Sequence, residues 1–219
     1  MTGGAPSASA GASRAGYVAW AVAGAAAVMV VVLAAAVGEG GALRGLDETV
    51  FQWIRRHSTP TLDGVMTLVS NGHRPRGIAL ITLLAAVVLW WRRDRLGALA
   101  LVGCVAVGST LNHLLKHSIM RPRPGFSAAE SVFTDYSFPS GHVANATLLY
   151  GTLALLICLR STSRRWCAAA TLAAAILVAA VGLSRLVLGV HHLSDVLAGF
   201  ALGVACVALC AGLIRRRHW

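Results

Sequence analysis

The sequence contains few charged residues. Only 12% of its 219 residues are Asp, Glu, Lys or Arg, about half the share of an ordinary soluble domain. Hydrophobic residues make up 57% of the chain, and the mean hydropathy is +0.70. This composition argues against a soluble globular protein and indicates a protein that crosses a membrane.

Acidic residues are especially scarce. The chain has 8 Asp and Glu against 19 Lys and Arg, which gives a net charge of +11 and a pI of about 10.9. Such an excess of positive charge can indicate nucleic-acid binding. Most of the arginines, however, stand in short clusters beside apolar runs, so we interpret them as signals of membrane topology and expect no nucleic-acid partner.

The cysteines lack the paired spacing that a zinc site or a disulfide framework shows. We expect all five to behave as small apolar side chains in or beside membrane segments. They are Cys104, Cys158, Cys167, Cys206 and Cys210.

Long apolar runs recur along the chain. The first, 17–37, is long enough at about 1.5 Å per residue to cross a hydrocarbon core of about 30 Å. A cleaved signal peptide is the alternative, but the run exceeds a usual signal core and little positive charge precedes it. Further spans are expected at 77–91, 97–115, 143–159, 167–184 and 194–214.

The predicted fold is therefore all-α: a polytopic membrane protein with six transmembrane helices in a bundle. Residues 1–16 are small and polar and predict a disordered tail, residues 17–214 form the membrane domain, and residues 215–219 form a basic tail. The connection 38–76 is the longest, and it could form one or two interfacial helices.

Arginine clusters predict the orientation. They follow the second, fourth and sixth spans, at Arg92, Arg93 and Arg95, at Arg160, Arg164 and Arg165, and at Arg215 to Arg217. By the positive-inside rule these ends and both termini are cytoplasmic. The connection 38–76 also carries five arginines, which Asp47, Glu48 and Asp63 offset in part.

Three polar stretches, 116–125, 138–142 and 184–195, fall in the connections expected outside. Cations at a membrane boundary are costly to desolvate unless they meet an anion. Snorkelling to lipid headgroups would explain the cations alone, but it explains poorly the histidines and Asp195, the one acid after residue 135. We expect an anion site at the extracytoplasmic end of the bundle.

Two adjacent histidines, His191 and His192, compete for a role beside Asp195. If the last span begins near His191, that residue and Asp195 are four apart and share a helix face, whereas His192 is rotated by about 100°. A carboxylate that orients one imidazole nitrogen leaves the other free as a nucleophile or base. The spacing therefore favours His191, and His192 is expected to have no catalytic role.

The three stretches together resemble the three-part signature of the type 2 phosphatidic acid phosphatase (PAP2) superfamily, which also contains glucose-6-phosphatases and vanadium-dependent haloperoxidases. The resemblance covers about residues 47–214, with its core at 116–195. The matching motifs are Lys116 followed after six residues by Arg123-Pro124, then Pro139-Ser140-Gly141-His142, then Ser184-Arg185 followed after five residues by His191 and after three more by Asp195.

The resemblance implies a role for each matching residue. His191 would attack phosphorus, Asp195 would orient it, and His142 would protonate the leaving oxygen and then activate water. The phosphoryl oxygens would be held by Lys116, Arg123, Arg185, the Ser140 hydroxyl and the Gly141 backbone N–H. Arg121 stands two residues short of the family spacing, so we treat it as peripheral.

The physics of phosphoryl transfer agrees with these roles, because the reaction needs positioning and fixed positive charge around three phosphoryl oxygens. A metal phosphatase would need several carboxylate or histidine ligands, and the motifs offer a single acid, so we expect no metal or other cofactor. A zinc hydrolase built on His142, His191 and His192 lacks the usual ligand spacing.

The sequence thus predicts a multi-pass lipid phosphatase of a bacterial cell (inner) membrane. Phosphatidic acid, diacylglycerol pyrophosphate, phosphatidylglycerol phosphate and undecaprenyl pyrophosphate all fit as substrates, with a weak preference for the polyprenyl diphosphate. The alternative is a non-enzymatic anion or lipid transporter with an outward basic vestibule, which would have no use for His142 or for the pairing of His191 with Asp195.

Overall fold

The computed structural model describes residues 8–38, 41–124 and 136–216, with side chains described for 16–38, 41–124 and 136–215. Within these ranges the chain forms eight helices and no strand. The expected all-α class is confirmed.

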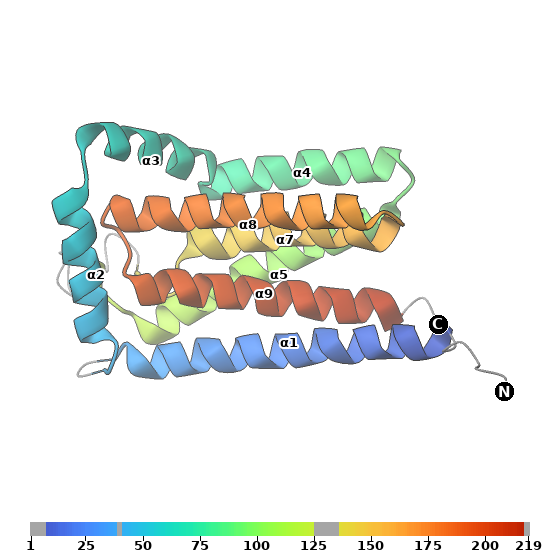
Figure 1. Cartoon of the computed structure of the whole chain (residues 1–219), viewed down its shortest axis with the longest axis horizontal. Helices are drawn as coiled ribbons and strands as arrows, with labels where there is room; N and C mark the ends of the chain where they lie inside the picture. The colour runs from blue at the N-terminus through green and yellow to red at the C-terminus, as the bar shows by residue number, and fades with distance from the viewer. Residues whose placement is uncertain (1–7, 39–40, 125–135, 217–219) are drawn as a thin grey trace.

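Five long helices run side by side along the longest axis of the molecule (Figure 1). Each contains a segment long and apolar enough to cross a membrane. They are α1 (Ala8–Ala36), α5 (Arg95–Ile119), α7 (Gly141–Arg160), α8 (Arg164–Val187) and α9 (Leu193–Arg216).

A sixth span is made by two helices together. α3 (Pro60–Gly72) and α4 (Pro75–Trp91) pass the same test as a pair, bent by 52° at the break between them. α4 has only 17 residues, about 26 Å of helix, so the expected span at 77–91 needs α3 to complete it. The described residues therefore hold five candidate spans, or six with the bent pair.

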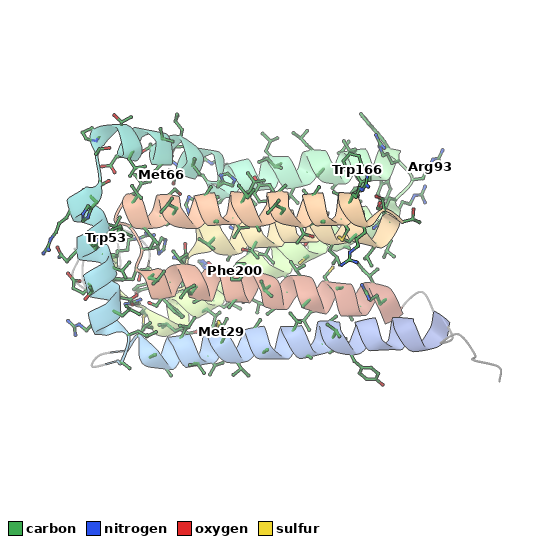
Figure 2. All side chains as sticks on the ribbon, in the orientation of Figure 1. Met29, Trp53, Met66, Arg93, Trp166 and Phe200 are labelled. Atoms are coloured by element: carbon green, nitrogen blue, oxygen red, sulfur yellow. A yellow bond between two sulfur atoms is a disulfide. The ribbon has the colours of Figure 1, made fainter. Side chains whose placement is uncertain are left out.

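α2 (Arg44–His57) lies across one end of this bundle, perpendicular to the long helices (Figure 1). With α3 it fills the connection 38–76, where one or two interfacial helices were expected. Most of α2 is exposed, and Trp53 points away from the bundle (Figure 2). Asp47 is the exception, because its side chain is only 2% exposed.

The opposite end of the bundle carries the arginine-rich connections. Figure 2 shows Arg93 and Trp166 there, and Trp166 is 69% exposed. α2 and these arginines thus lie at opposite ends of the spans. If the arginine clusters are a topology signal, α2 and the clusters must lie on opposite sides of the membrane.

Two chain reversals position the polar stretches at the α2 end of the bundle. α5 ends at Met120, whose backbone has a positive φ of 48° and whose N–H donates to the carbonyl of Lys116 at 2.9 Å. This left-handed residue stops the helix and turns the chain into Arg121–Pro124. α7 then begins at Gly141, directly after the cis Phe138–Pro139 bond and Ser140.

α7 is the central helix, packed against α5, α8 and α9. α9 approaches the start of this helix closely at Gly199, where a Cβ would lie 2.5 Å from the Ser140 carbonyl oxygen. Small residues permit such close approach of membrane helices. The start of α7 and the first turns of α9 are thereby brought together.

The expectation that all five cysteines remain unpaired is wrong. Cys158 and Cys167 form a disulfide between the end of α7 and the start of α8, with their Cα atoms 4.6 Å apart. The short turn between two antiparallel helices brings these positions within disulfide range, although their spacing resembles no known framework. Cys104, Cys206 and Cys210 are free.

Candidate active site

The three polar stretches converge at the α2 end of the bundle (Figure 1). They follow α5, precede α7, and link α8 to α9, so four long helices contribute to one region. Several hydrogen bonds join the stretches directly, two of them to backbone carbonyls. The Ser140 N–H donates to the Asp195 carbonyl at 2.9 Å, and Nη1 of Arg123 donates to the Val190 carbonyl at 3.0 Å.

His191 and Asp195 face one another as the sequence predicts. Nδ1 of His191 lies 3.5 Å from Oδ2 of Asp195, and the two side chains are 2% and 0% exposed. A buried carboxylate at this distance favours a proton on Nδ1. Nε2 is then the nitrogen with a free lone pair.

The helix-face argument that separated the two histidines is wrong, because α9 begins at Leu193, after both of them. Nδ1 of His192 lies 3.7 Å from the same carboxylate oxygen, almost as near as that of His191. Their surroundings distinguish them instead. His191 is buried among the cations of the site, whereas the ring of His192 faces Phe51 on α2, with centroids 6.3 Å apart.

Burial lowers the pKa of His191 from 6.5 to about 4. The nearby carboxylate of Asp195 opposes this shift, and the positive charges of Arg123 and Arg185 reinforce it. At neutral pH the imidazole is therefore uncharged, which is the state a nitrogen nucleophile requires.

Arg121 is not peripheral. Its Nη1 donates to Oδ1 of Asp195 at 2.6 Å and to Oγ of Ser194 at 2.7 Å. Its Nη2 donates to Oδ2 of Asp47 at 2.8 Å. The family spacing did not predict this position of Arg121. The turn after Met120 directs Arg121 toward α9, whereas Arg123 reaches Val190.

Asp47 completes this cluster, and no pattern in the sequence indicates that it would. It accepts the backbone N–H of Ser194 at 3.0 Å and the Ser194 hydroxyl at 2.5 Å. Asp47 and Ser194 are 147 residues apart in the chain. Asp47 is one of several charged residues of α2, and nothing in the sequence indicates that it is the buried one. Asp47, Arg121 and Ser194 thus belong to the site region.

Each of the three candidate phosphate-binding cations donates to a neutral oxygen. Lys116, 6% exposed, donates to the Tyr136 carbonyl. Arg185, 8% exposed, donates through Nη1 to the Ser70 hydroxyl at the end of α3, and Arg123 donates to Val190. None of these three acceptors is charged. Ser70, like Asp47, contacts a residue of the site although no pattern in the sequence predicts this.

Several buried polar atoms near these cations have no hydrogen-bond partner among the described residues. They include Oγ of Ser140, Nε2 of His142 and Nε of Arg185. The imidazole of His142 also lies within electrostatic range of Arg123, Arg185 and His191. Buried polar groups ordinarily find partners, so donors and acceptors left over in one region are suited to a polar ligand.

Gly141 is the first residue of α7, where backbone N–H groups and the helix dipole favour an anion. A Cβ at this position would lie 3.2 Å from Oδ1 of Asn112 and 3.8 Å from Cε of Lys116. The absence of a side chain lets the backbone stand close to the lysine. Cations, a helix N-terminus and a neutral buried imidazole together can bind a phosphoryl group and attack it.

A metal would need a different arrangement. Among the residues described, no three His, Cys, Asp or Glu side chains are grouped as ligands, and the zinc alternative built on His142, His191 and His192 finds no such group.

Comparisons with known proteins show the family of the chain. Residues 97–219 match the model of the PAP2 superfamily. The chain is 32% identical to phosphatidylglycerophosphatase B of Bacillus subtilis over 186 residues, 83% of this chain and 89% of the relative. It is 30% identical to an undecaprenyl-diphosphatase of Sulfolobus acidocaldarius over 165 residues, 73% of this chain and 74% of the relative.

Solved structures extend the similarity to the fold. The crystal structure of a transmembrane PAP2 type phosphatidylglycerolphosphate phosphatase from Bacillus subtilis matches with a TM-score of 0.79 and 26% identity, covering 89% of this chain and 96% of that one. LpxE of Aquifex aeolicus matches with a TM-score of 0.57 and 23% identity, covering 78% and 95%. The second likeness concerns the fold alone.

Proposed function

Because the chain belongs to the PAP2 superfamily, we propose that it is an integral membrane phosphatase that hydrolyses lipid phosphates or pyrophosphates without a metal ion. The observation that carries this proposal is the pairing of buried, uncharged His191 with Asp195, within electrostatic range of Arg123 and Arg185. The names of the curated relatives, a phosphatidylglycerophosphatase and an undecaprenyl-diphosphatase, support a phosphorylated lipid as substrate.

In the first step Nε2 of His191 attacks the terminal phosphorus, and the bond from this phosphorus to the leaving oxygen breaks. The leaving oxygen is the ester oxygen of a lipid monophosphate or the bridging oxygen of a lipid diphosphate. His142, protonated when substrate is bound, gives its proton to that leaving oxygen. A lipid alcohol is released, or a lipid monophosphate when the substrate is a diphosphate, and the phosphoryl group remains on His191. Asp195 stabilises the positive charge that the imidazole gains as the P–N bond forms.

In the second step His142 takes a proton from water, which attacks phosphorus as the P–N bond breaks. Inorganic phosphate leaves, His191 becomes neutral again, and His142 is protonated for the next cycle. Lys116, Arg123 and Arg185, with the Ser140 hydroxyl and the Gly141 N–H, hold the phosphoryl oxygens throughout. Guanidinium groups suit bidentate contact with phosphate, and lysine adds a point charge.

The substrate is a lipid whose tail stays in the bilayer while its phosphate enters the site. Phosphatidic acid, phosphatidylglycerol phosphate and undecaprenyl pyrophosphate meet this description. We measure phosphate release from each by the purified protein in detergent with a chelator present, beside His191→Ala. Release that needs His191 supports the proposal. Absence of release from every lipid, or release that stops in chelator and returns with magnesium, contradicts it.

We further propose that the site faces the extracytoplasmic side of a cell membrane, with both termini in the cytoplasm. The arginine clusters at the opposite end of the spans support this orientation. In intact cells a membrane-impermeant maleimide should label a single cysteine at exposed Glu48 on α2, and should label one at exposed Thr162 between α7 and α8 only after lysis. The reverse pattern would contradict the orientation.

A further inference from the structure

Asp47 is a buried acid on a mostly exposed helix, and it lies outside residues 97–219 that match the family model. A carboxylate is costly to bury unless it is paired and hydrogen-bonded. Asp47 meets this requirement through Arg121 and Ser194, both beside the catalytic candidates. Its partners are therefore a reason to ask what it does for the reaction.

Asp47 acts first on the N-terminus of α9. The first N–H groups of a helix have no partner within it. Oδ1 of Asp47 accepts the Ser194 N–H, and Oδ2 of Asp195 accepts the His192 N–H at 2.8 Å. Two carboxylates, one from another helix and one from α9 itself, thus fix the first turn from which Asp195 projects.

Asp47 acts second on Arg121. The guanidinium stands between two acids, with Nη2 on Asp47 and Nη1 on Asp195. The Ser194 hydroxyl joins them, because it accepts from Nη1 and donates to Asp47. Both Nη groups of Arg121 are hydrogen-bonded. Arg121 therefore binds Oδ1 of Asp195, and Oδ2 of Asp195 faces the imidazole of His191.

The charges of this cluster point in the same direction. Two carboxylates and one guanidinium carry a net charge of −1. Without Asp47 the sum would be zero, and the undivided charge of Arg121 would draw the Asp195 carboxylate toward itself. The imidazole that becomes positive during attack on phosphorus would then lose part of its stabilisation.

We propose that Asp47 is a positioning residue for phosphoryl transfer, which acts through Arg121 and Ser194 to hold the Asp195 carboxylate against His191. This inference rests on the proposed function. It makes α2, a helix outside the family signature, a part of the catalytic arrangement.

The test compares Asp47→Asn with Glu48→Gln. Both replace one carboxylate of α2, but Glu48 is exposed and bonds only to Gln52 among the described residues. We expect Asp47→Asn to lower kcat about 10- to 100-fold, the scale on which small misplacements of reacting groups act, with KM changed by less than about threefold. Glu48→Gln should retain both constants. An equal kcat for both variants, or a loss confined to KM, would overturn the inference.

A double variant tests the route through Arg121. Arg121→Lys keeps a positive charge but cannot bridge two acids in the same way. If Asp47 acts through Arg121, the variant with both changes should be no slower than Arg121→Lys alone. Multiplied losses would show that Asp47 acts by another route.

Spectroscopy separates positioning from general support of the fold. In ¹⁵N-histidine-labelled protein the His191 ring signals, assigned by their loss in His191→Ala, should shift in Asp47→Asn and stay in place in Glu48→Gln. Unchanged signals would overturn the inference. If wild type releases no phosphate from any lipid, the proposed function fails, while these spectra still decide whether Asp47 sets the environment of His191.

A milder variant applies if Asp47→Asn does not fold. Ser194→Ala removes only the hydroxyl between Arg121 and Asp47, so it should fold, which thermal unfolding in detergent checks. It should show a smaller loss of kcat with KM retained. Full kcat in folded Ser194→Ala would contradict the relay.

Discussion

The backbone N–H of Ser140 donates to the carbonyl of Asp195 at 2.9 Å. This bond fastens the residue before α7 to the first turn of α9, so two motifs far apart in the sequence are connected through the main chain. The bond therefore also constrains the relative positions of His142, in the first turn of α7, and Asp195, in the first turn of α9. Substitutions at the site should therefore change chemistry more than fold.

Replacement of each adjacent histidine tests which one reacts. His191→Ala should remove turnover, because the buried imidazole among the cations is lost. His192→Ala should keep most of it, since the hydrogen bond of His192 to Asp195 at 2.8 Å comes from the backbone N–H, which alanine retains. Phosphate release in detergent measures both. The opposite ranking would assign the nucleophile to His192.

Asp195→Asn tests the orienting carboxylate. The amide keeps the size of the side chain but loses the charge that stabilises a positive His191, so kcat should fall by about 10²- to 10⁴-fold while KM changes little. Unchanged turnover would remove Asp195 from the mechanism. A large rise in KM alone would make it a substrate-binding residue.

The depressed pKa of His191 predicts a specific dependence on pH. The ring should titrate near 4 in the free protein, not near 6.5, because burial disfavours its charged form. The unfolded chain takes up a proton at about 6.5 and the native chain does not, so this residue makes stability fall as pH drops from about 6.5 toward 4. Histidine NMR in detergent measures the midpoint, and a value near 6.5 would contradict the depressed pKa.

The proposed orientation puts the disulfide between Cys158 and Cys167 at the cytoplasmic end, where thiols are normally kept reduced. In purified, oxidised protein it should support the fold without affecting catalysis. It closes a short loop at the end of the bundle away from the candidate site, and loops of this size are worth about 2–3 kcal/mol. The double serine variant should melt at a lower temperature and keep its kcat. Equal melting temperatures for the two proteins would show that the pair is not bonded in solution.

The sequence predicted the helical class, the apolar spans and the three motifs, because hydropathy and the local spacing of residues can be read directly from it. It could not predict Asp47 against Ser194 or Ser70 against Arg185, since those contacts depend on how α2 and α3 fold back over the bundle. Arg121 was expected to be peripheral, because its position depends on the left-handed backbone conformation of Met120, which the sequence does not reveal. The preference for His191 is supported by burial, although the helix-face argument for it failed.

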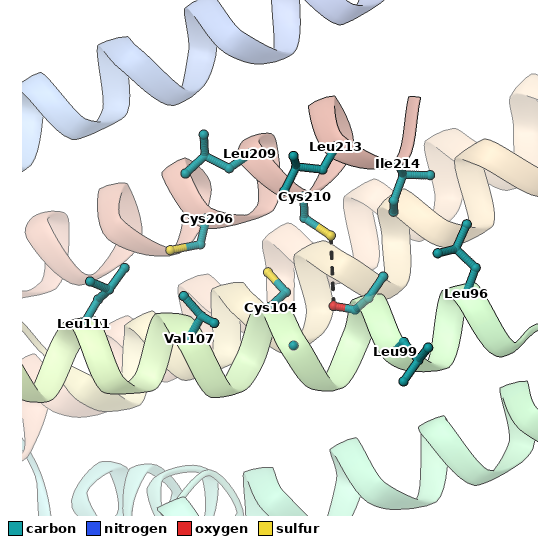
Figure 3. Close-up of a pocket in the computed structure, with 12 residues that line it drawn as sticks. Leu96, Leu99, Cys104, Val107, Leu111, Cys206, Leu209, Cys210, Leu213 and Ile214 are labelled. Atoms are coloured by element: carbon teal, nitrogen blue, oxygen red, sulfur yellow. Dashed lines mark hydrogen bonds between the residues drawn. The ribbon is translucent and has the colours of Figure 1, made fainter. Parts of the chain in front are cut away.

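An apolar groove of about 450 Å³ between α5 and α9 shows how unevenly these helices are packed (Figure 3). Leu111, Val107 and Cys206 line it, and it lies along the lipid-spanning part of both helices. The same α9 is pressed against α7 on another side, at Gly199. α9 is thus separated from α5 along the groove and packed closely against α7 on another side.

Gly199 carries a consequence for the dimensions of the site. A methyl group there would lie 2.5 Å from the carbonyl oxygen of Ser140, so even alanine would push the two helices apart. His142 lies in the first turn of one of these helices, and His191 stands just before the start of the other. The absence of a side chain at Gly199 therefore keeps the starts of the two helices close, and with them the two histidines that flank the site.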